Sequence, residues 1–331
     1  MRILSVVGKN YYGRPGFIEP MYLEFTDPLA DLGHEVEHFD HAEIRKQFGL
    51  EGCGDRFIER VKSGRYDMVL YQTAGQDWMP PEAIREASRY GPIVAWNSDD
   101  DWQWDSYTRH LAPYFTFMVT TYPHIYEANR EQYPNLILSQ WGCYDRFADF
   151  SRQKDMDFTF VGRIYGYRNR DCRYLRRKAG LRVYGAGARL VNLGFSSFRG
   201  CSRIPGLMGQ PIADYAKVNE IWNRSRISYT PLGSSIDPRA LQIKGRVFQM
   251  GLSGTLMLCD NHPELARYYE PGKDFVAFED LEDCVEKAKY YLAHEAERAR
   301  IAKAYHDRTK AQHLWQLRFV KLFQNIGLGK S

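Results

Sequence analysis

The stretch Ile227–Asp260, ISYTPLGSSIDPRALQIKGRVFQMGLSGTLMLCD, contains the sequence pattern that decides the fold of this chain. Ile227–Thr230 is rich in strand-forming residues, and the Pro, Gly and Ser residues that follow it predict a loop. Lys244–Leu252 is compatible with a short helix that ends at Gly254, and Thr255–Cys259 is a compact apolar strand. We therefore expect a strand, a loop, a short helix and a second strand.

The expected helix carries side chains that suit a phosphate group. Arg246 and Gln249 lie three residues apart, so they share one face of the helix. A loop that enters a helix presents free backbone N–H groups and a positive dipole end, which favour anions. Lys244 and Arg246 add full positive charges at this place. The alternative is an amphipathic surface helix with two solvated cations, and the spacing alone leaves both interpretations open.

Length and composition predict two domains in a soluble chain. The sequence has 331 residues, of which 44% are hydrophobic, and this is enough for two domains with cores of their own. No run approaches the roughly 20 apolar residues of a membrane span. The first residues, MRILSVVGKN, lack the apolar run of a signal peptide. We therefore expect a cytoplasmic protein without a transmembrane segment.

Charge and side-chain chemistry leave several partners open. The net charge of +4 permits a polyanionic partner without requiring one. Aromatic residues make up 15% of the chain and offer stacking surfaces for sugars or bases, besides core packing. The cysteines are scattered and form no CxxC pair, so neither disulfides nor a zinc site are expected. They are Cys53, Cys143, Cys172, Cys201, Cys259 and Cys284.

The first half of the chain alternates strands and helices. A strand over Arg2–Val7, a loop with glycines, a helix from about residue 17 to 32 and a strand over His34–Phe39 are the opening of a doubly wound α/β domain. The loop after the first strand is where such folds bind ligands. Its glycines do not form GxGxxG, so no dinucleotide site is predicted. The loop is interpreted as a mobile segment over a cleft or as an ordinary surface loop.

Three consecutive carboxylates, Asp99–Asp101, follow the strand predicted over Pro92–Trp96. Packed like charges raise one another's pKa, which would make one of them a general base. Asp99 and Asp100 are the candidates for this role. The alternatives are solvated charges that cap the next helix and a metal site.

The second half begins again with a strand, over Asp157–Val161, after a polar linker that places the domain boundary near Ser151. Gly162 and Arg163 follow this strand directly, and Arg168 comes one loop later. The guanidinium group of arginine suits bidentate binding of a diphosphate. The alternative is a basic helix cap, because further arginines continue along the same predicted helix.

A family resemblance rests on the run that begins at Arg246. RVFQMGLSGTLMLCDNHPELARYYEPGKDFVAFEDLEDCVEKAKYYL resembles the C-terminal half of CgeB-like and group 1 glycosyltransferases. Gly162–Arg163 resembles the phosphate-facing turn of that superfamily, and the residues at 313, 315 and 318 fit its closing His-x-Trp-x-x-Arg helix. The residues of the run that fall on the family pattern are Arg246, Phe248, Gly254, Glu264, Leu265, Tyr268, Tyr269, Gly272 and Asp280.

The resemblance implies the GT-B architecture, with two doubly wound, Rossmann-like domains that face across a cleft. Residues 1–150 would form the acceptor-side domain and residues 151–331 the nucleotide-sugar donor domain, with the last helix packed on the N-terminal domain. The implied activity moves a hexosyl or pentosyl group from a nucleotide-diphosphate sugar to an acceptor hydroxyl. No metal is expected, because cationic side chains and a helix end would stabilise the leaving diphosphate.

The implied donor contacts are Gly162, Arg163, Arg168, Lys244, Arg246 and Gln249. In the family a Glu at the last of these positions grips the ribose hydroxyls. Gln249 can still form hydrogen bonds to a hydroxyl but carries no charge. The family's partner acidic position, eight residues earlier, is Leu241 here. CgeB-like relatives also carry an Asp pair near Asp99 and Asp100, which favours the general-base interpretation.

Two other classes of function stay open. A non-catalytic nucleotide-sugar binding protein is suggested by Gln249 and Leu241. A glycosyltransferase that modifies a base in DNA is suggested by the mild positive charge and by the arginine-rich stretch Arg163–Arg182. The nucleotide base and the acceptor, whether a saccharide, a protein, a small molecule or a DNA base, are left open by the sequence.

Overall fold

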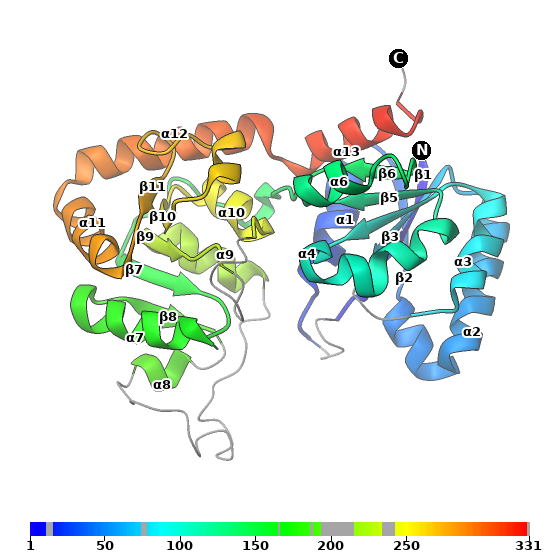
Figure 1. Ribbon diagram of the computed structural model, residues 1–331, viewed down its shortest axis with the longest axis horizontal. Coiled ribbons are helices and arrows are strands. Elements are labelled where there is room, and N and C mark those ends of the chain that lie inside the picture. The colour runs from blue at the N-terminus through cyan, green and yellow to red at the C-terminus, as the bar shows by residue number, and fades with distance from the viewer. Residues whose placement is uncertain are drawn as a thin grey trace. The chain divides into compact units, whose positions relative to one another are not determined.

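The computed structural model describes residues 1–10, 16–73, 78–164, 166–185, 188–192, 215–233 and 242–329. The chain divides into two compact units: unit 1 comprises Met1–Trp141 and Trp315–Ser331, and unit 2 comprises Gly142–Leu314 (Figure 1). Residues 142–150, at the start of the polar linker, therefore belong to unit 2. Leu241 and part of the predicted glycine loop after the first strand lie outside the described residues.

Unit 1 is built on a parallel sheet of six strands in the order β2-β1-β3-β4-β5-β6. Parallel strands are buried on both faces, and all five residues of β4 are accordingly buried. This sheet confirms the predicted doubly wound domain. The strands are β1 Arg2–Val6, β2 Glu35–Phe39, β3 Met68–Thr73, β4 Ile93–Asn97, β5 Phe117–Thr120 and β6 Leu136–Leu138.

The last helix of the chain completes the core of unit 1. Trp315 is fully buried on α13, and its ring centroid lies 5.1 Å from that of Trp96 and 5.6 Å from that of Phe25. Figure 1 shows α13 beside α1. The helices of unit 1 are α1 Pro20–Asp31, α2 His41–Gly64, α3 Pro81–Ala87, α4 Asp100–Gln103, α5 Arg109–Leu111, α6 Pro123–Asn129 and α13 Trp315–Asn325; η2 (Ser88–Tyr90), η3 (Trp104–Thr108) and η4 (Ala112–Tyr114) join them.

Helix α2 has no counterpart among the elements expected from the sequence. This helix was not predicted because its sequence contains several glycines, which weaken a helical pattern. Gly49 has a φ of 74° and breaks the helix at that point. Gly54 permits close packing on α3, since a β-carbon there would lie 2.9 Å from the β-carbon of Ala83. Gly54 therefore serves helix packing, whereas Gly49 marks the kink.

Unit 2 is built on a parallel sheet of five strands in the order β11-β10-β9-β7-β8. The two strands and the short helix between them expected over residues 227–260 are confirmed, and Gly254 ends the helical segment in the left-handed region. The strands are β7 Met156–Val161, β8 Arg182–Tyr184, β9 Ser225–Thr230, β10 Leu256–Asp260 and β11 Val276–Phe278. The helices are α7 Tyr167–Ala179, α8 Ala188–Asn192, α9 Tyr215–Arg224, α10 Gly245–Gln249, α11 Leu281–Ala293 and α12 Glu295–Gln312, with η5 Asp145–Phe147, η7 Met250–Ser253 and η8 Pro263–Arg267.

The sequence from Leu281 to Phe323 has a helical pattern throughout, but the structure does not form one continuous helix there. It breaks at His294 and again at His313–Leu314, so that α11 and α12 belong to unit 2 and α13 to unit 1. At the second break the backbone N–H of Cys143 donates to the carbonyl of His313 at 2.9 Å. The two places where the chain passes from one unit to the other are thus joined by a hydrogen bond.

The segment that enters unit 2 is fastened to it by buried polar groups. The side chain of Asn223, near the end of α9, accepts from the backbone N–H of Asp149 at 3.0 Å and donates to the carbonyl of Phe147 at 2.8 Å. The Lys154 ammonium donates to the carbonyls of Asn223 and Ser253, at the ends of α9 and η7. A cation in this place complements the negative ends of two helical segments.

Among the described residues, no helix is both long and apolar enough to cross a membrane. The cysteines of the described ranges are free thiols, and all five of them are buried.

Candidate active site

The carboxyl edge of the sheet in unit 1 is lined with polar side chains. Thr73 ends β3 and Asn97 ends β4, and the Thr73 hydroxyl donates to the Asn97 side-chain oxygen at 2.5 Å. Thr120 ends β5 and is fully buried. Ligands of doubly wound domains bind at this edge. Polar groups on three neighbouring strands therefore form the floor of a candidate site.

Asp99 and Asp100 follow β4 at this edge. Asp99 occupies the N-cap position of α4 without a side-chain capping hydrogen bond to the described residues of that helix. The helix-cap alternative therefore has no hydrogen bond in its support. Asp100, by contrast, is only 1% exposed, at the first position of α4.

Burial is the main reason why the pKa of Asp100 is raised from 3.8 to about 6. The hydroxyls of Thr120 and Thr108 oppose this rise, and the charges of the neighbouring Asp99 and Asp101 add to it as smaller contributions. The mechanism expected from the sequence, mutual repulsion of like charges, is thus secondary to desolvation. A carboxyl group with a pKa of about 6 has the proton affinity that a general base needs near neutral pH.

Glu19 is a second carboxyl group with a raised pKa in unit 1, and the sequence did not single it out. It precedes α1, and its backbone N–H donates to the carbonyl of Lys9 at 2.9 Å. Burial raises the pKa of Glu19 to about 7. The available signal was an acidic residue just before the helix that follows the first strand.

The carboxyl edge of unit 2 brings Gly162 and Arg246 together. Gly162 follows β7, and a β-carbon on it would lie 3.2 Å from Nη1 of Arg246 and 3.0 Å from the ring of Phe160. Gly185 follows β8, and a β-carbon there would overlap the carbonyl oxygen of Gly162. Two glycine positions, Gly162 and Gly185, and the guanidinium of Arg246 therefore lie close together at this edge. Arg163 comes next to Gly162 and is exposed.

Arg168 and Lys244 occupy different positions. Arg168 is buried, and its guanidinium donates to the carbonyl of Gly233 at 2.7 Å. It therefore fixes the start of the loop after β9. Lys244 precedes α10 and is partly exposed. Asp260, at the end of β10, accepts a hydrogen bond from the backbone N–H of Leu232 at 2.5 Å, and burial raises its pKa. Like Glu19, Asp260 was not recognised from the sequence.

Gln249 is 2% exposed, and its amide is surrounded by protein groups. Its oxygen accepts from the backbone N–H of Tyr144 at 2.9 Å and from the hydroxyl of Tyr215 at 2.6 Å. Its nitrogen donates to the carbonyl of Tyr144 at 2.9 Å and to the side-chain oxygen of Asn219 at 2.7 Å. A primary amide has two donors and two acceptor sites, so these bonds use its whole capacity. The ribose contact stays a prediction, and it competes with four hydrogen bonds.

His313 lies in an aromatic enclosure in unit 2. It is 4% exposed, and its ring centroid is 5.0 Å from those of Phe248 and Tyr269 and 5.9 Å from that of Tyr268. This packing gives the family-pattern residues around it a structural role. In the described ranges no cluster of three or more His, Cys, Asp and Glu residues has an arrangement that could hold a metal ion.

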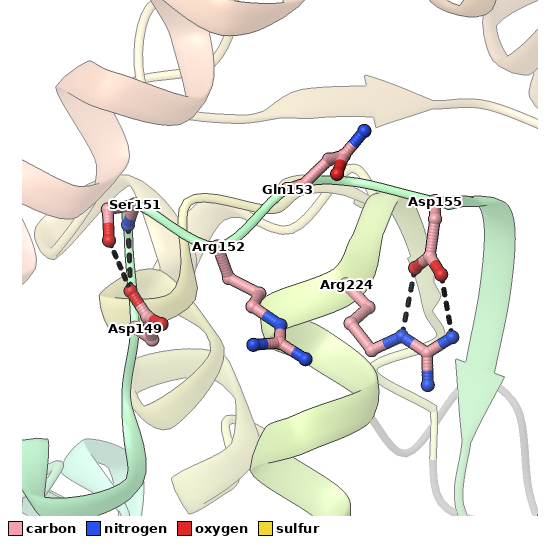
Figure 2. Close-up of a pocket in the computed structure, with 6 residues that line it drawn as sticks. All are labelled: Asp149, Ser151, Arg152, Gln153, Asp155 and Arg224. Atoms are coloured by element: carbon pink, nitrogen blue, oxygen red, sulfur yellow. Dashed lines mark hydrogen bonds and ion pairs between the residues drawn. The ribbon is translucent and has the colours of Figure 1, made fainter.

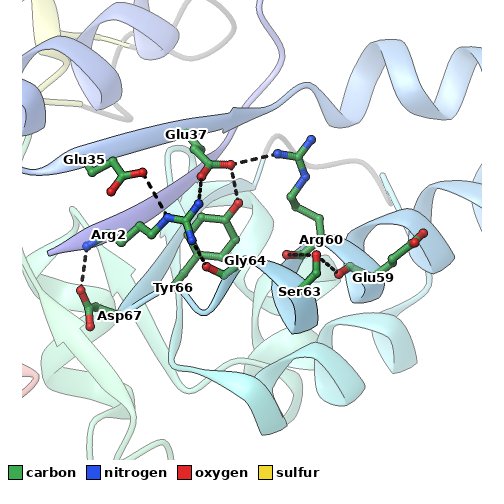
Figure 3. A network of polar contacts seen from close by, with 9 residues as sticks. All are labelled: Arg2, Glu35, Glu37, Glu59, Arg60, Ser63, Gly64, Tyr66 and Asp67. Atoms are coloured by element: carbon green, nitrogen blue, oxygen red, sulfur yellow. Dashed lines mark hydrogen bonds and ion pairs between the residues drawn. The ribbon is translucent and has the colours of Figure 1, made fainter.

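Two further polar clusters lie at the amino edges of the sheets, opposite the candidate sites. In unit 2 a surface pocket of about 760 Å³ lies where the chain enters β7 and β9, and Figure 2 shows Arg224 paired with Asp155 inside it. The pocket is lined by Asp149, Ser151, Arg152, Gln153, Asp155 and Arg224. In unit 1 the guanidinium of Arg2 joins Glu35, Glu37 and the end of α2 (Figure 3). These ion pairs link charged side chains at the edges of the sheets where the strands begin.

Solved structures of the same fold, in which two α/β units each contain a parallel sheet, define the class. An alpha-glucosyltransferase in complex with UDP-glucose and DNA containing an abasic site has a TM-score of 0.64 at 13% identity, and the match covers 99% of each chain. HepE from Anabaena, in complex with UDP and glucose, has a TM-score of 0.63 at 11% identity, again over 99% of each chain. A glycosyltransferase from Rickettsia africae ESF-5 has a TM-score of 0.62 at 12% identity, over 98% of this chain and 97% of the other. The fold is therefore that of the GT-B glycosyltransferases, as predicted.

Residues 148–324 match the model of the glycosyl transferase-like family, and this is more than half of the chain. The protein belongs to that family. The comparison with curated proteins gave no match. The predicted likeness to the CgeB-like subgroup stays a prediction.

Proposed function

We propose that this protein transfers a glycosyl group from a uridine-diphosphate sugar to a hydroxyl group of an acceptor, without a metal ion. Family membership supports glycosyl transfer. The choice of uridine follows from the neighbours solved with UDP or UDP-glucose. The observation that carries the proposal is that the guanidinium of Arg246 lies beside Gly162, which has no side chain, on the carboxyl edge of unit 2.

Arg246 is the principal diphosphate ligand in this proposal. Because Gly162 has no side chain, a diphosphate can approach both the backbone of the turn and the guanidinium beside it. A guanidinium binds two phosphate oxygens at once and neutralises the charge that develops on the leaving group. Arg163 and Lys244 add positive charge on the neighbouring segments. Arg168 acts through Gly233, by holding the start of the loop after β9.

Asp100 is the proposed general base, with Asp99 beside it. The acceptor hydroxyl gives its proton to the carboxylate, and its oxygen forms a bond to the anomeric carbon of the sugar. The bond between that carbon and the diphosphate oxygen breaks, and the electron pair leaves with UDP. The raised pKa of Asp100 supports this role, because a carboxylate at its ordinary pKa of 3.8 would be a weaker base.

A thermal-shift titration tests the donor half. UDP, GDP, ADP and CDP are added to the protein in the presence of a metal chelator. UDP at 100 times its dissociation constant should add about 2.7 kcal/mol to the stability. Mass spectrometry then follows sugar transfer from UDP-sugars. Binding without turnover would identify the non-catalytic alternative, and stabilisation that requires a divalent cation would contradict the metal-free proposal.

A further inference from the structure

Trp102 differs from every other tryptophan that the structure describes. Its side chain is 65% exposed on α4, which makes it the most exposed large hydrophobic residue of the described ranges. Five others are buried and Trp78 is partly buried. The buried ones are Trp96, Trp104, Trp141, Trp222 and Trp315. An indole exposed to water leaves a large apolar surface unburied. An exposed indole close in sequence to a candidate general base is therefore a candidate ligand contact.

The helical geometry fixes the outward direction of Trp102. Trp104, two residues later, points to the opposite side because successive helical positions are about 100° apart. It is 4% exposed and packs with its ring centroid 5.4 Å from that of Tyr133. The burial of Trp104 therefore holds Trp102 outward. The turn that follows, Trp104–Thr108, is π-helical, and such turns are frequent at functional sites.

The surroundings of Trp102 are acidic. Four aspartates and no lysine or arginine lie between Asn97 and Thr108. Asp105 is 83% exposed and pairs with Arg109 at 3.1 Å. A nucleic acid brings a phosphate every few ångströms and would be repelled here. A neutral sugar ring has an apolar face that packs on an indole and hydroxyls that donate to carboxylates.

We propose that Trp102 is the acceptor platform of this enzyme, on which a pyranose ring of a neutral saccharide stacks while a hydroxyl of the ring faces Asp99, three residues earlier and on the same side of the helical turn. This inference rests on the proposed function and specifies its acceptor as a saccharide. It excludes the DNA base as acceptor at this edge. Trp102 is a binding residue here and takes no part in proton transfer.

The first test measures binding without catalysis. Neutral di- and trisaccharides of glucose, galactose, mannose and N-acetylglucosamine are titrated against the full-length protein, with acrylamide quenching of tryptophan fluorescence as the readout. At least one saccharide should protect an exposed indole in the natural protein, and the protected component should vanish in Trp102→Phe. Failure of every saccharide to protect Trp102 would overturn the inference, and protection by a single-stranded oligothymidylate would then favour nucleic acid instead.

The second test uses the saccharide identified by the first. Trp102→Ala should raise the KM for this acceptor by about tenfold or more, while Trp102→Phe keeps most of the affinity. Tyr90→Ala is the matched control, because Tyr90 is 39% exposed but precedes β4, at the amino edge of the sheet. Equal KM values for the Trp102→Ala and Tyr90→Ala variants would overturn the inference alone. Absence of sugar transfer from every UDP-sugar would instead contradict the proposed function, and the quenching experiment would still decide the inference.

Discussion

The side-chain amide of Gln249 forms two hydrogen bonds with the backbone of Tyr144, in the pattern of two paired residues on neighbouring β-strands. The N–H of Tyr144 donates to the amide oxygen and the amide nitrogen donates to the carbonyl of Tyr144, both at 2.9 Å. Tyr144 lies just inside unit 2, after the chain has left unit 1. Gln249 therefore fixes the entering segment to α10, the helix whose Arg246 is the proposed diphosphate ligand.

Replacement of Gln249 by Leu should destabilise unit 2. The variant leaves the N–H and carbonyl of Tyr144 and the side chains of Tyr215 and Asn219 without their partner in a buried place. Unsatisfied buried groups cost about 1–3 kcal/mol each, and partial relaxation makes a total of roughly 2–4 kcal/mol the expected loss. Urea unfolding measures it. Gln132→Leu, at an exposed position, is the control and should change the stability little.

Replacement of Gln249 by Glu separates two roles of this residue. A carboxylate cannot donate to the carbonyl of Tyr144 or to Asn219, so we expect lower stability and weaker UDP binding. The ribose contact implied by the family resemblance gives the opposite expectation, because Glu is the family residue there. Isothermal titration with UDP decides: an affinity kept or improved in Gln249→Glu supports the ribose contact and contradicts the structural role.

Replacement of Gly162 by Ala should weaken UDP binding through Arg246. The added β-carbon would lie 3.2 Å from Nη1 of Arg246 and 3.0 Å from the ring of Phe160, so the guanidinium must move. Arg246→Ala should weaken binding by about tenfold or more, since a charged hydrogen bond contributes roughly 1.5–3 kcal/mol. Arg170→Ala, on an exposed side chain of α7, is the control. Titration calorimetry with UDP measures all three, and equal affinities would remove Arg246 from the site.

Asp100 should link stability to pH. Its pKa of about 6 in the folded state exceeds the ordinary 3.8, so the folded state holds this proton more tightly than the unfolded chain does. The stability that Asp100 contributes is therefore complete below about pH 4 and is lost as the pH rises to about 6, with a total on the order of 3 kcal/mol. Asp100→Asn should remove this dependence, so that the variant is more stable than the natural protein above about pH 6, while sugar transfer is lost.

Urea unfolding at a series of pH values checks the Asp100 prediction. Asp105→Asn is the matched control, because Asp105 is 83% exposed on the turn that follows. It should leave the pH profile as it is. A natural protein whose stability rises between pH 4 and 6 in a way that Asp100→Asn abolishes would contradict the assigned direction.

Trp315 should make a large contribution to unit 1. It is fully buried among Phe25, Trp96 and Trp141. Replacement of a buried tryptophan by alanine typically costs about 3–5 kcal/mol. Leu317→Ala is the control on the same helix, because Leu317 is 42% exposed. Circular dichroism during urea unfolding measures the loss, and similar midpoints for the two variants would show that α13 contributes little to the core.

Strands such as β4 and β10 were predictable from the sequence because they are short apolar runs between turn-forming residues. Helix α2 was not, since Gly49, Gly52 and Gly54 break its pattern, although Gly54 serves its packing on α3. The shared face of Arg246 and Gln249 could be read from their spacing. The partner of Gln249 could not, because Tyr144 lies 105 residues earlier in the chain.

The candidate site was predictable where it depends on chain order and not where it depends on burial. Asp100 was found because it follows a strand, but desolvation as the main cause of its raised pKa is a property of the packed unit. Arg168 was read as a phosphate ligand from a motif, and only the packed structure reveals its bond to Gly233. Trp102 and Trp104 look alike in sequence, and their exposures of 65% and 4% come from packing.

The division of unit 1 into two pieces of sequence sets the order in which the protein can fold during its synthesis. Residues 1–141 leave the ribosome before unit 2, but α13 follows only after residue 314. At roughly 5–20 residues per second, residues 142–314 take about 9–35 s to synthesise, and the partners of Trp315 wait at least this long for it. During this interval Phe25, Trp96 and Trp141 lack the indole that packs against them. The nascent chain therefore presents an aromatic surface for which a chaperone would compete with the protein's own last helix.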